Sequence, residues 1–347
     1  MNPWTFLRFL FLPALVIAGS MLGTLWNFSI PVACFVIHPL VSLLSGKVSS
    51  VHPEEEHHLN KTNAYRIIPL LFVPVLIALT VWSVVQSNSN SSIAFAGMAI
   101  SVGIVNGILG FTLSHELIHR HTWIQKTAGH LLLLQNNYPY YGIEHIRGHH
   151  VYACTEKDPH TASINESFYR FLPRAIHHTF LNAWKIESIR LQHRGKNIIS
   201  RHNQMLQFIL LQFFCYASII VVAGWKPFLF FIFQSAVAIF LLNITGYLQH
   251  YGLKRKETGQ GRFEKISAHH AWSSRPGKDG LNLFHVGNHA DHHMHPDHSY
   301  EQLVHHHDSP KQPTGYSGMI WLALVPPLWF KIMNKRIPSF TTKNYSI

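Results

Sequence analysis

The chain has 347 residues, of which 47% are hydrophobic and only 13% are charged, and its formal net charge is +12. This composition excludes a disordered or collagen-like chain. A mean hydropathy of +0.09 with so few charges favours a basic membrane protein over a nucleic-acid-binding protein. Three cysteines are too few for a disulfide framework or a four-cysteine metal site, so any metal needs nitrogen and oxygen ligands.

Six apolar runs are long enough to cross a bilayer, whose hydrocarbon core of about 30 Å needs about 20 apolar residues. The predicted transmembrane helices cover residues 4–24, 28–46, 67–86, 92–114, 205–224 and 227–248. The length of the first run favours an uncleaved anchor over a signal peptide. A seventh run, Met319–Phe330, is shorter and contains two prolines, so we expect an interfacial or re-entrant segment that does not cross.

Lys and Arg residues are unevenly distributed between the connections. Residues 115–204 hold eleven and residues 249–347 hold twelve, whereas the short links on the opposite side hold only Lys226. The positive-inside rule therefore places both termini and these two segments in the cytoplasm, as in a multi-pass protein of the inner (cytoplasmic) membrane. We predict an all-α integral membrane protein, a single domain over 1–347 with six transmembrane helices and a cytoplasmic histidine-rich di-metal lobe.

Histidine is the residue type that points to chemistry, because 24 of the 28 histidines follow residue 114. His115 and His119 have the i, i+4 spacing that places two imidazoles on one helix face. His145 and His149 repeat it, and the adjacent His150 points about 100° away, so this cluster can serve two metals. Further candidates are His250, at the end of the sixth run, and His289, His292 and His293. Nine imidazoles suffice for two centres.

Each of these signals has a plainer interpretation. A lone histidine at a helix end, such as His250, is commonly an interfacial residue. The run His305–His307 reads as solvated loop, and His121, His130, His160, His177, His178, His193 and His202 read as surface or structural residues. His115-Glu116-Leu117-Ile118-His119 also matches the motif of zinc proteases. An intramembrane zinc protease would leave most of the nine histidines unused, whereas imidazole without thiolates suits two redox-capable metals.

The histidine motifs resemble those of the alkane monooxygenase and xylene monooxygenase branch of the membrane-bound fatty-acid desaturase and hydroxylase superfamily. The resemblance is carried by HELIHR at 115–120, EHIRGHH at 144–150, LQHYGL at 248–253 and NHADHH at 288–293. It implies an O2-dependent alkane 1-monooxygenase with a non-haem centre of two iron ions (Fe2+/Fe3+), which hydroxylates the terminal methyl group of a hydrophobic substrate. The implied ligands are His115, His119, His145, His149, His150, His250, His289, His292 and His293.

Other residues are weaker candidates. Glu116, Glu144 and Asp291 could accept hydrogen bonds from the ligand imidazoles, with a salt bridge to Arg120 or Arg147 as the alternative. The apolar walls of a substrate path are predicted to come largely from the fourth and sixth runs. Candidates there are Phe111, Leu241 and Ile244, for which simple core packing is the alternative.

The motifs leave the reaction open. Gln249 and the Asn288-His289 pair are closer to xylene monooxygenases, so an aromatic methyl hydroxylase is an alternative, as is a fatty-acid desaturase or decarboxylase that forms a terminal alkene. Because the chain has no flavin, nicotinamide or iron–sulfur motif, electrons must come from a separate protein. The resemblance implies rubredoxin or a ferredoxin-type donor with its reductase. The 23 cytoplasmic Lys and Arg residues of 115–204 and 249–347 would attract such an acidic carrier, or an anionic membrane surface.

Overall fold

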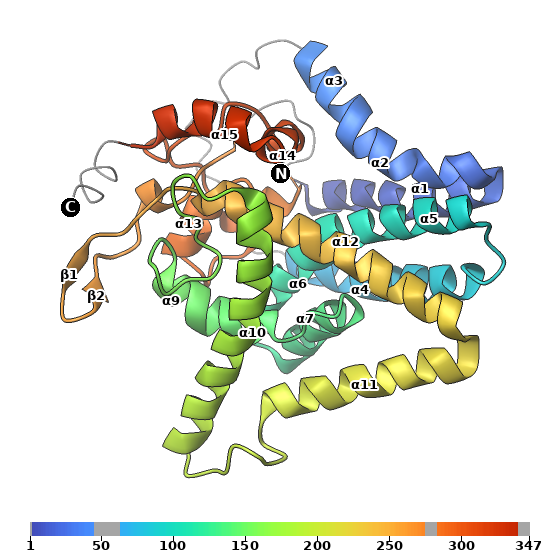
Figure 1. Ribbon diagram of the computed structural model, residues 1–347, viewed down its shortest axis with the longest axis horizontal. Helices are drawn as coiled ribbons and strands as arrows, with labels where there is room; N and C mark the ends of the chain where they lie inside the picture. The colour runs from blue at the N-terminus through green and yellow to red at the C-terminus, as the bar shows by residue number, and fades with distance from the viewer. Residues whose placement is uncertain (1, 45–62, 275–282, 339–347) are drawn as a thin grey trace. The chain divides into compact units, whose positions relative to one another are not determined.

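A computed structural model describes residues 2–44, 63–274 and 283–338 of the chain (Figure 1). Nearly all regular structure in these residues is helical, which confirms the predicted all-α class. The described strands, β1 (Glu257–Gly259) and β2 (Arg262–Phe263), form one short antiparallel hairpin. The helices divide between two compact units, which are described separately below.

Six candidate membrane spans agree with the six predicted ones. They are Pro3–Leu22, Thr24–Val41, Ala64–Gln86, Ser92–Ile118, Gln204–Ala223 and Trp225–His250. The fourth span extends past its predicted end and includes His115, and the sixth includes His250. Residues 45 and 46 of the second predicted span lie outside the described residues. The chain therefore has the helices of a multi-pass membrane protein.

The first unit comprises Met1–Ile37, Lys61–Ile143 and Ala183–Leu242. Its helices are η1 (Pro3–Leu10), α1 (Phe11–Leu22), η2 (Thr24–Phe28), α2 (Ser29–Val32), η3 (Ala33–Ile37), α4 (Ala64–Gln86), α5 (Ser92–Val105), η4 (Asn106–Gly110), α6 (Phe111–Ile118), α7 (Trp123–Gln135) and α11 (Gln204–Ala223). Helices α8 (Tyr141–Glu144), α10 (Phe168–His193) and α12 (Trp225–His250) contribute residues to both units.

Close helix packing in the first unit depends on small and polar residues within the spans. A Cβ atom at Gly103 would lie 2.6 Å from the carbonyl oxygen of Gln234, so only glycine permits this approach of α5 to α12. Nearby, the buried Asn106 amide donates hydrogen bonds to Thr80 Oγ1 (3.0 Å) and Gln234 Oε1 (2.9 Å). Asn106 begins the π-helical turn η4, so one irregular turn links α4, the fourth span and α12 through side-chain hydrogen bonds.

The second unit comprises His38–Asn60, Glu144–Asn182 and Asn243–Ile347. Its elements are α3 (His38–Leu44), the π-helical turn η5 (His145–His149), α9 (His150–Tyr152), β1, β2, η6 (Ala268–His270), η7 (Leu283–His285), α13 (His289–Met294), η8 (Tyr300–Gln302), α14 (Tyr316–Ala323), α15 (Pro326–Met333) and η9 (Asn334–Arg336). Buried aromatic rings of Tyr247, Tyr251 and Trp329 pack with centroids 5.1–5.3 Å apart and anchor the end of α12 to α15.

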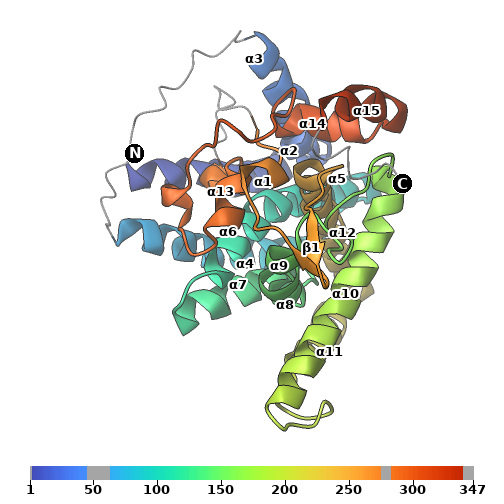
Figure 2. The same ribbon diagram turned by 90° about the vertical axis from the view of Figure 1, so that its left-hand side faces the viewer.

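The seventh apolar run forms α14 and the helix Pro326–Arg336, which are bent against each other by 119° (Figure 2). Proline at the start of the second helix explains the break, because its ring prevents a straight continuation of α14. Such a pair is either a broken span or a re-entrant loop. The segment Met319–Phe330 is therefore not one straight crossing helix.

Candidate metal centre

Four buried histidines converge in the second unit and form what we call the four-histidine group: His149, His250, His289 and His293. They come from η5, α12 and α13. One ligand atom from each lies within 4.8 Å of the others. His289 Nε2 is 3.0 Å from His250 Nε2 and 2.9 Å from His293 Nε2. This donor set has the composition of a metal site made of imidazole alone.

Hydrogen bonds outside the group set the tautomers of two of these rings. His250 Nδ1 is 3.1 Å from the carbonyl oxygen of His270, which can only accept, so this nitrogen carries the proton. His149 Nδ1 lies 3.0 Å from Asp158 Oδ2 and donates in the same way. Both rings therefore direct the lone pair of Nε2 toward the group, which is the arrangement that metal binding requires.

Asp158 is the carboxylate that supports His149. Burial opposes its charge, but the charge of His149 and the hydrogen bond between them hold the pKa of Asp158 well below its usual range. Burial also opposes protonation of His149, but Asp158 outweighs it and raises the pKa of His149. Thr161 Oγ1 and the backbone N–H of His160 donate to the same carboxylate at 2.6 and 3.0 Å. The negative charge that attracts a proton to His149 also attracts a metal cation.

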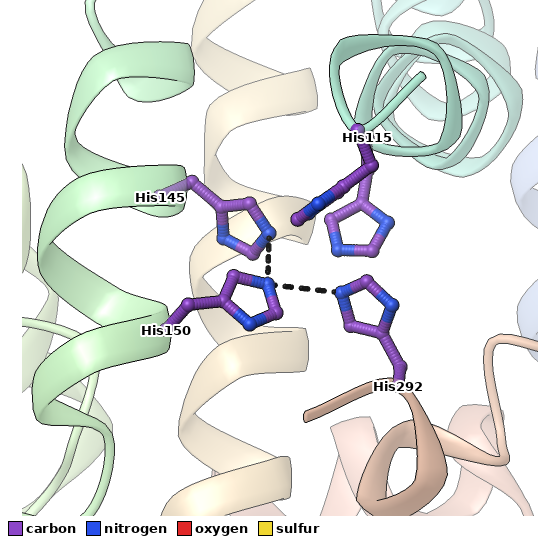
Figure 3. A group of neighbouring side chains, drawn as sticks. His115, His145, His150 and His292 are labelled. Atoms are coloured by element: carbon purple, nitrogen blue, oxygen red, sulfur yellow. Dashed lines mark hydrogen bonds between the residues drawn. The ribbon is translucent and has the colours of Figure 1, made fainter. Parts of the chain in front are cut away.

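A second set, the three-histidine group, consists of His145, His150 and His292 (Figure 3). His150 Nε2 lies 3.1 Å from His145 Nε2 and 3.0 Å from His292 Nε2. The two groups are neighbours in the second unit, because the ring centroids of His150 and His293 are only 4.8 Å apart. Two sets of convergent imidazoles therefore adjoin each other, and each has ligands that could hold a metal.

The remaining predicted ligands, His115 and His119, belong to the first unit. Their ligand atoms lie within 4.8 Å of each other and their ring centroids are 5.1 Å apart. His115 lies in the last turn of α6 and His119 caps its C-terminus. The i, i+4 spacing thus gives the shared helix face that the sequence predicts.

The Nε2 atoms of buried imidazoles face one another in the second unit, which is evidence for a metal site there. A hydrogen bond between two Nε2 atoms needs a proton on one of them, and His289 Nε2 faces two such partners at once. Burial and the neighbouring imidazoles lower the pKa of His293 well below its ordinary value, so protonation there is disfavoured. Neutral imidazoles crowded in this way are satisfied by a shared cation, and the residues present fit a metal centre.

The three predicted supporting carboxylates each have a described partner, and their support of the ligand imidazoles stays a prediction. Glu116 forms an ion pair with Arg120 Nε at 3.2 Å, the alternative that the sequence left open. Glu144 is fully buried with Oε2 3.5 Å from His160 Nε2. Asp291 Oδ1 accepts from His295 Nδ1 (3.0 Å) and His306 Nε2 (2.7 Å), which lie outside the nine predicted ligands.

The three weak substrate candidates are all buried. Phe111 is 2% exposed and stacks edge-on against Tyr138 and Tyr141, while Leu241 and Ile244 are 7% and 0% exposed. Leu241 packs against Gly107, where a Cβ atom would approach its Cδ1 to 2.8 Å. These contacts are those of core packing, and a role in binding substrate stays a prediction.

Sequence reasoning missed Asp158 and the buried environment of His160. Asp158 lies nine residues after His149, too far for a helical spacing pattern to connect them. His160 is 4% exposed, and its ring centroid lies 5.5 Å from that of His149. The one local signal is the run Asp158-Pro159-His160, an acid and an imidazole held in a turn directly after the second histidine cluster.

Comparison with known proteins shows the family to which the chain is similar. A model of the fatty acid desaturase family matches residues 91–323. Alkane 1-monooxygenase 1 of Pseudomonas aeruginosa is 36% identical over 91% of this chain and 84% of its own length. Alkane 1-monooxygenase 2 of Alcanivorax borkumensis is 35% identical over 91% and 84%. The xylene/toluene monooxygenase hydroxylase component XylM of Pseudomonas putida is 27% identical over 69% and 63%.

The chain belongs to the fatty acid desaturase family. Within that family it belongs to the branch that contains the alkane 1-monooxygenases, whose members match it over most of its length. Its likeness to the xylene monooxygenase component is more distant. The resemblance predicted from the histidine motifs is thereby confirmed.

Proposed function

We propose that the protein is a membrane non-haem di-iron monooxygenase that uses O2 to hydroxylate the terminal methyl group of an alkane-type substrate. The observation that carries this proposal is the pair of adjoining histidine groups in a chain about 35% identical to alkane 1-monooxygenases. Hydroxylation of an aromatic methyl group has weaker support, because the XylM relative is only 27% identical.

The proposed ligands are the nine histidines predicted from the sequence. The four-histidine group would hold one iron, and the three-histidine group, completed by His115 and His119, would hold the other. The assignment of His115 and His119 rests on their spacing and on the family motif. Bound iron would supply the activation of O2 and the redox chemistry, which no side chain here provides.

The protein's own residues hold and shield this centre. Asp158 and the His270 carbonyl orient His149 and His250 through their Nδ1 protons. The four-histidine group is at most 7% exposed, so bulk water has little access to it. Apolar spans leading to His115 and His250 suit a substrate that enters from the bilayer. Phe111, Leu241 and Ile244 are proposed to line its path.

Electrons are proposed to come from rubredoxin or a ferredoxin-type protein and its reductase. The basic segments 115–204 and 249–347 support this, because complementary charge accelerates docking of an acidic carrier. If docking is electrostatic, the rate of reduction falls as salt is raised. A rate independent of salt contradicts this docking mode.

We also propose that these segments and both termini face the cytoplasm, with the protein in the inner membrane.

The direct test is metal analysis after anaerobic purification of the wild type, His149→Ala and the control His178→Ala, which changes an exposed histidine of α10. O2, reductant, octane, dodecane, p-xylene and lauric acid are then supplied. We expect about two irons per chain and a primary alcohol from an alkane for the wild type and the control, and less iron without product for His149→Ala. Zinc in place of iron, or no O2 consumption, contradicts the proposal.

A further inference from the structure

A second kind of histidine cluster lies at the far end of α13. Asp291 is almost fully buried, with its side chain 1% exposed, whereas the side chains of His295 and His298 are 46% and 43% exposed. One ligand atom from each of these three residues lies within 4.8 Å of the others. None of these three residues is a proposed iron ligand, although Asp291 lies on α13 beside three of those ligands.

The local backbone orients both imidazoles toward the same carboxylate. His295-Pro296-Asp297-His298 forms a turn closed by a 2.9 Å hydrogen bond from His298 N–H to the His295 carbonyl. The two rings stack with centroids 4.6 Å apart and planes inclined by 15°. His295 Nδ1 lies 3.0 Å from Asp291 Oδ1, and His298 Nδ1 lies 3.7 Å from Asp291 Oδ2.

The distance of 3.7 Å exceeds that of a hydrogen bond but suits two ligands of one ion. Bonds of about 2.0–2.1 Å around a tetrahedral zinc ion place neighbouring ligand atoms about 3.3 Å apart. His306 Nε2, 2.7 Å from Asp291 Oδ1, and Val304 N–H, 3.2 Å from Oδ2, hold the carboxylate in place. The half-exposed rings leave a route by which an ion can reach it.

We propose that Asp291, His295 and His298 form an accessory site for a divalent metal ion of the zinc type, separate from the iron ligands. Two imidazoles and a carboxylate are ligands that zinc prefers, and water would complete the coordination. The ion would tie the C-terminal end of α13 to the turn that follows it. Because α13 has only six residues and carries three proposed iron ligands, such a tie would stabilise it.

The test titrates zinc into the iron-loaded full-length enzyme, removes weakly bound ions by gel filtration, and measures zinc and iron per chain in the same samples. The variants are His298→Gln and His295→Gln, and the matched control is His307→Gln, an exposed histidine outside the cluster. We expect about one retained zinc per chain in the wild type and control, an affinity at least tenfold weaker in both variants, and unchanged iron in all four.

Three outcomes would overturn the site: equal zinc retention in His298→Gln and the wild type, loss of zinc in His307→Gln, or zinc uptake only as iron is lost. The last result would assign the zinc to the iron ligands. Thermal unfolding provides a second readout, since zinc should raise the melting temperature of the wild type and not that of His298→Gln. Because iron is counted separately, failure of this site is distinguishable from failure of the proposed di-iron function.

Discussion

Helix α13 and the π-helical turn η5 each supply histidines to both groups, but with different spacing. On α13, His289 and His293, four residues apart, share the four-histidine group. Around η5, His145 and His150, five residues apart, share the three-histidine group, while His149 belongs to the other. The spacing that brings two imidazoles together is thus four residues in one segment and five in the next.

The type of helix explains the difference. A π-helical turn closes with an i→i+5 hydrogen bond, and the backbone N–H of His150 donates to the carbonyl of His145 in this way. That turn places residues five apart on one face, whereas the α-helix places residues four apart there. The assignment of histidines to ions therefore depends on backbone hydrogen bonding as well as on sequence spacing.

Removing single ligands has the largest expected effect and tests this grouping. His145→Ala and His150→Ala should each empty one iron position, and His289→Ala and His293→Ala the other, with hydroxylation reduced to background in all four. Mössbauer spectra of the iron that is left should be alike within a pair and different between pairs. His149→Ala decides the comparison: a spectrum like that of His145→Ala would mean that α-helical spacing governs η5 after all.

Asp158→Asn is expected to have the next largest effect. The amide keeps the shape of the carboxylate but removes the charge that supports His149, so iron affinity or activity should fall about 10–100-fold. Asp308→Asn, at an exposed position, is the control. Because the pKa of Asp158 is lowered in the fold, its stabilising charge is present above about pH 4 and is lost as the pH falls further. The free energy of unfolding of the wild type should therefore approach that of Asp158→Asn in this acidic range. Equal activity of the two proteins at neutral pH would refute the role of Asp158 in supporting His149.

The sequence predicts the spans well because hydrophobic length is a local property. The six observed spans overlap the six predicted ones. The seventh run is bent before Pro326, and that it does not cross stays a prediction. The i, i+4 face shared by His115 and His119 is likewise local, and it is present at the end of α6.

Non-local contacts could not be predicted in the same way. Asp158 contacts His149 because a turn brings the two together, and the carbonyl of His270 contacts His250 although they are twenty residues apart in the sequence. No periodic pattern in the sequence predicts either contact. The π-helical turn at His145 was missed because sequence spacing assumes α-helical geometry. Charge alone could not decide the partner of Asp291, since several histidines follow it within one short segment.

Another π-helical turn, η4, lies within the fourth span and provides a smaller test. Asn106→Leu removes hydrogen bonds to Thr80 and Gln234 within the spans and should cost about 1–2 kcal/mol of stability. Iron content should not change, because Asn106 contributes an amide and no metal ligand. Unfolding in detergent micelles and metal analysis measure the two effects. Loss of iron in this variant would show that η4 also shapes the metal centre.

The smallest expected effect concerns the apolar segment of α12 that precedes His250. Ile244→Val removes one methyl group from a fully buried side chain and should cost about 0.5–1.5 kcal/mol. Ile68→Val, at another fully buried isoleucine, should cost as much and serves as the control. If Ile244 lines the substrate path, its variant alone should shift the preferred alkane toward longer chains, measured by competition between octane and dodecane. An equal preference in both variants assigns Ile244 to core packing.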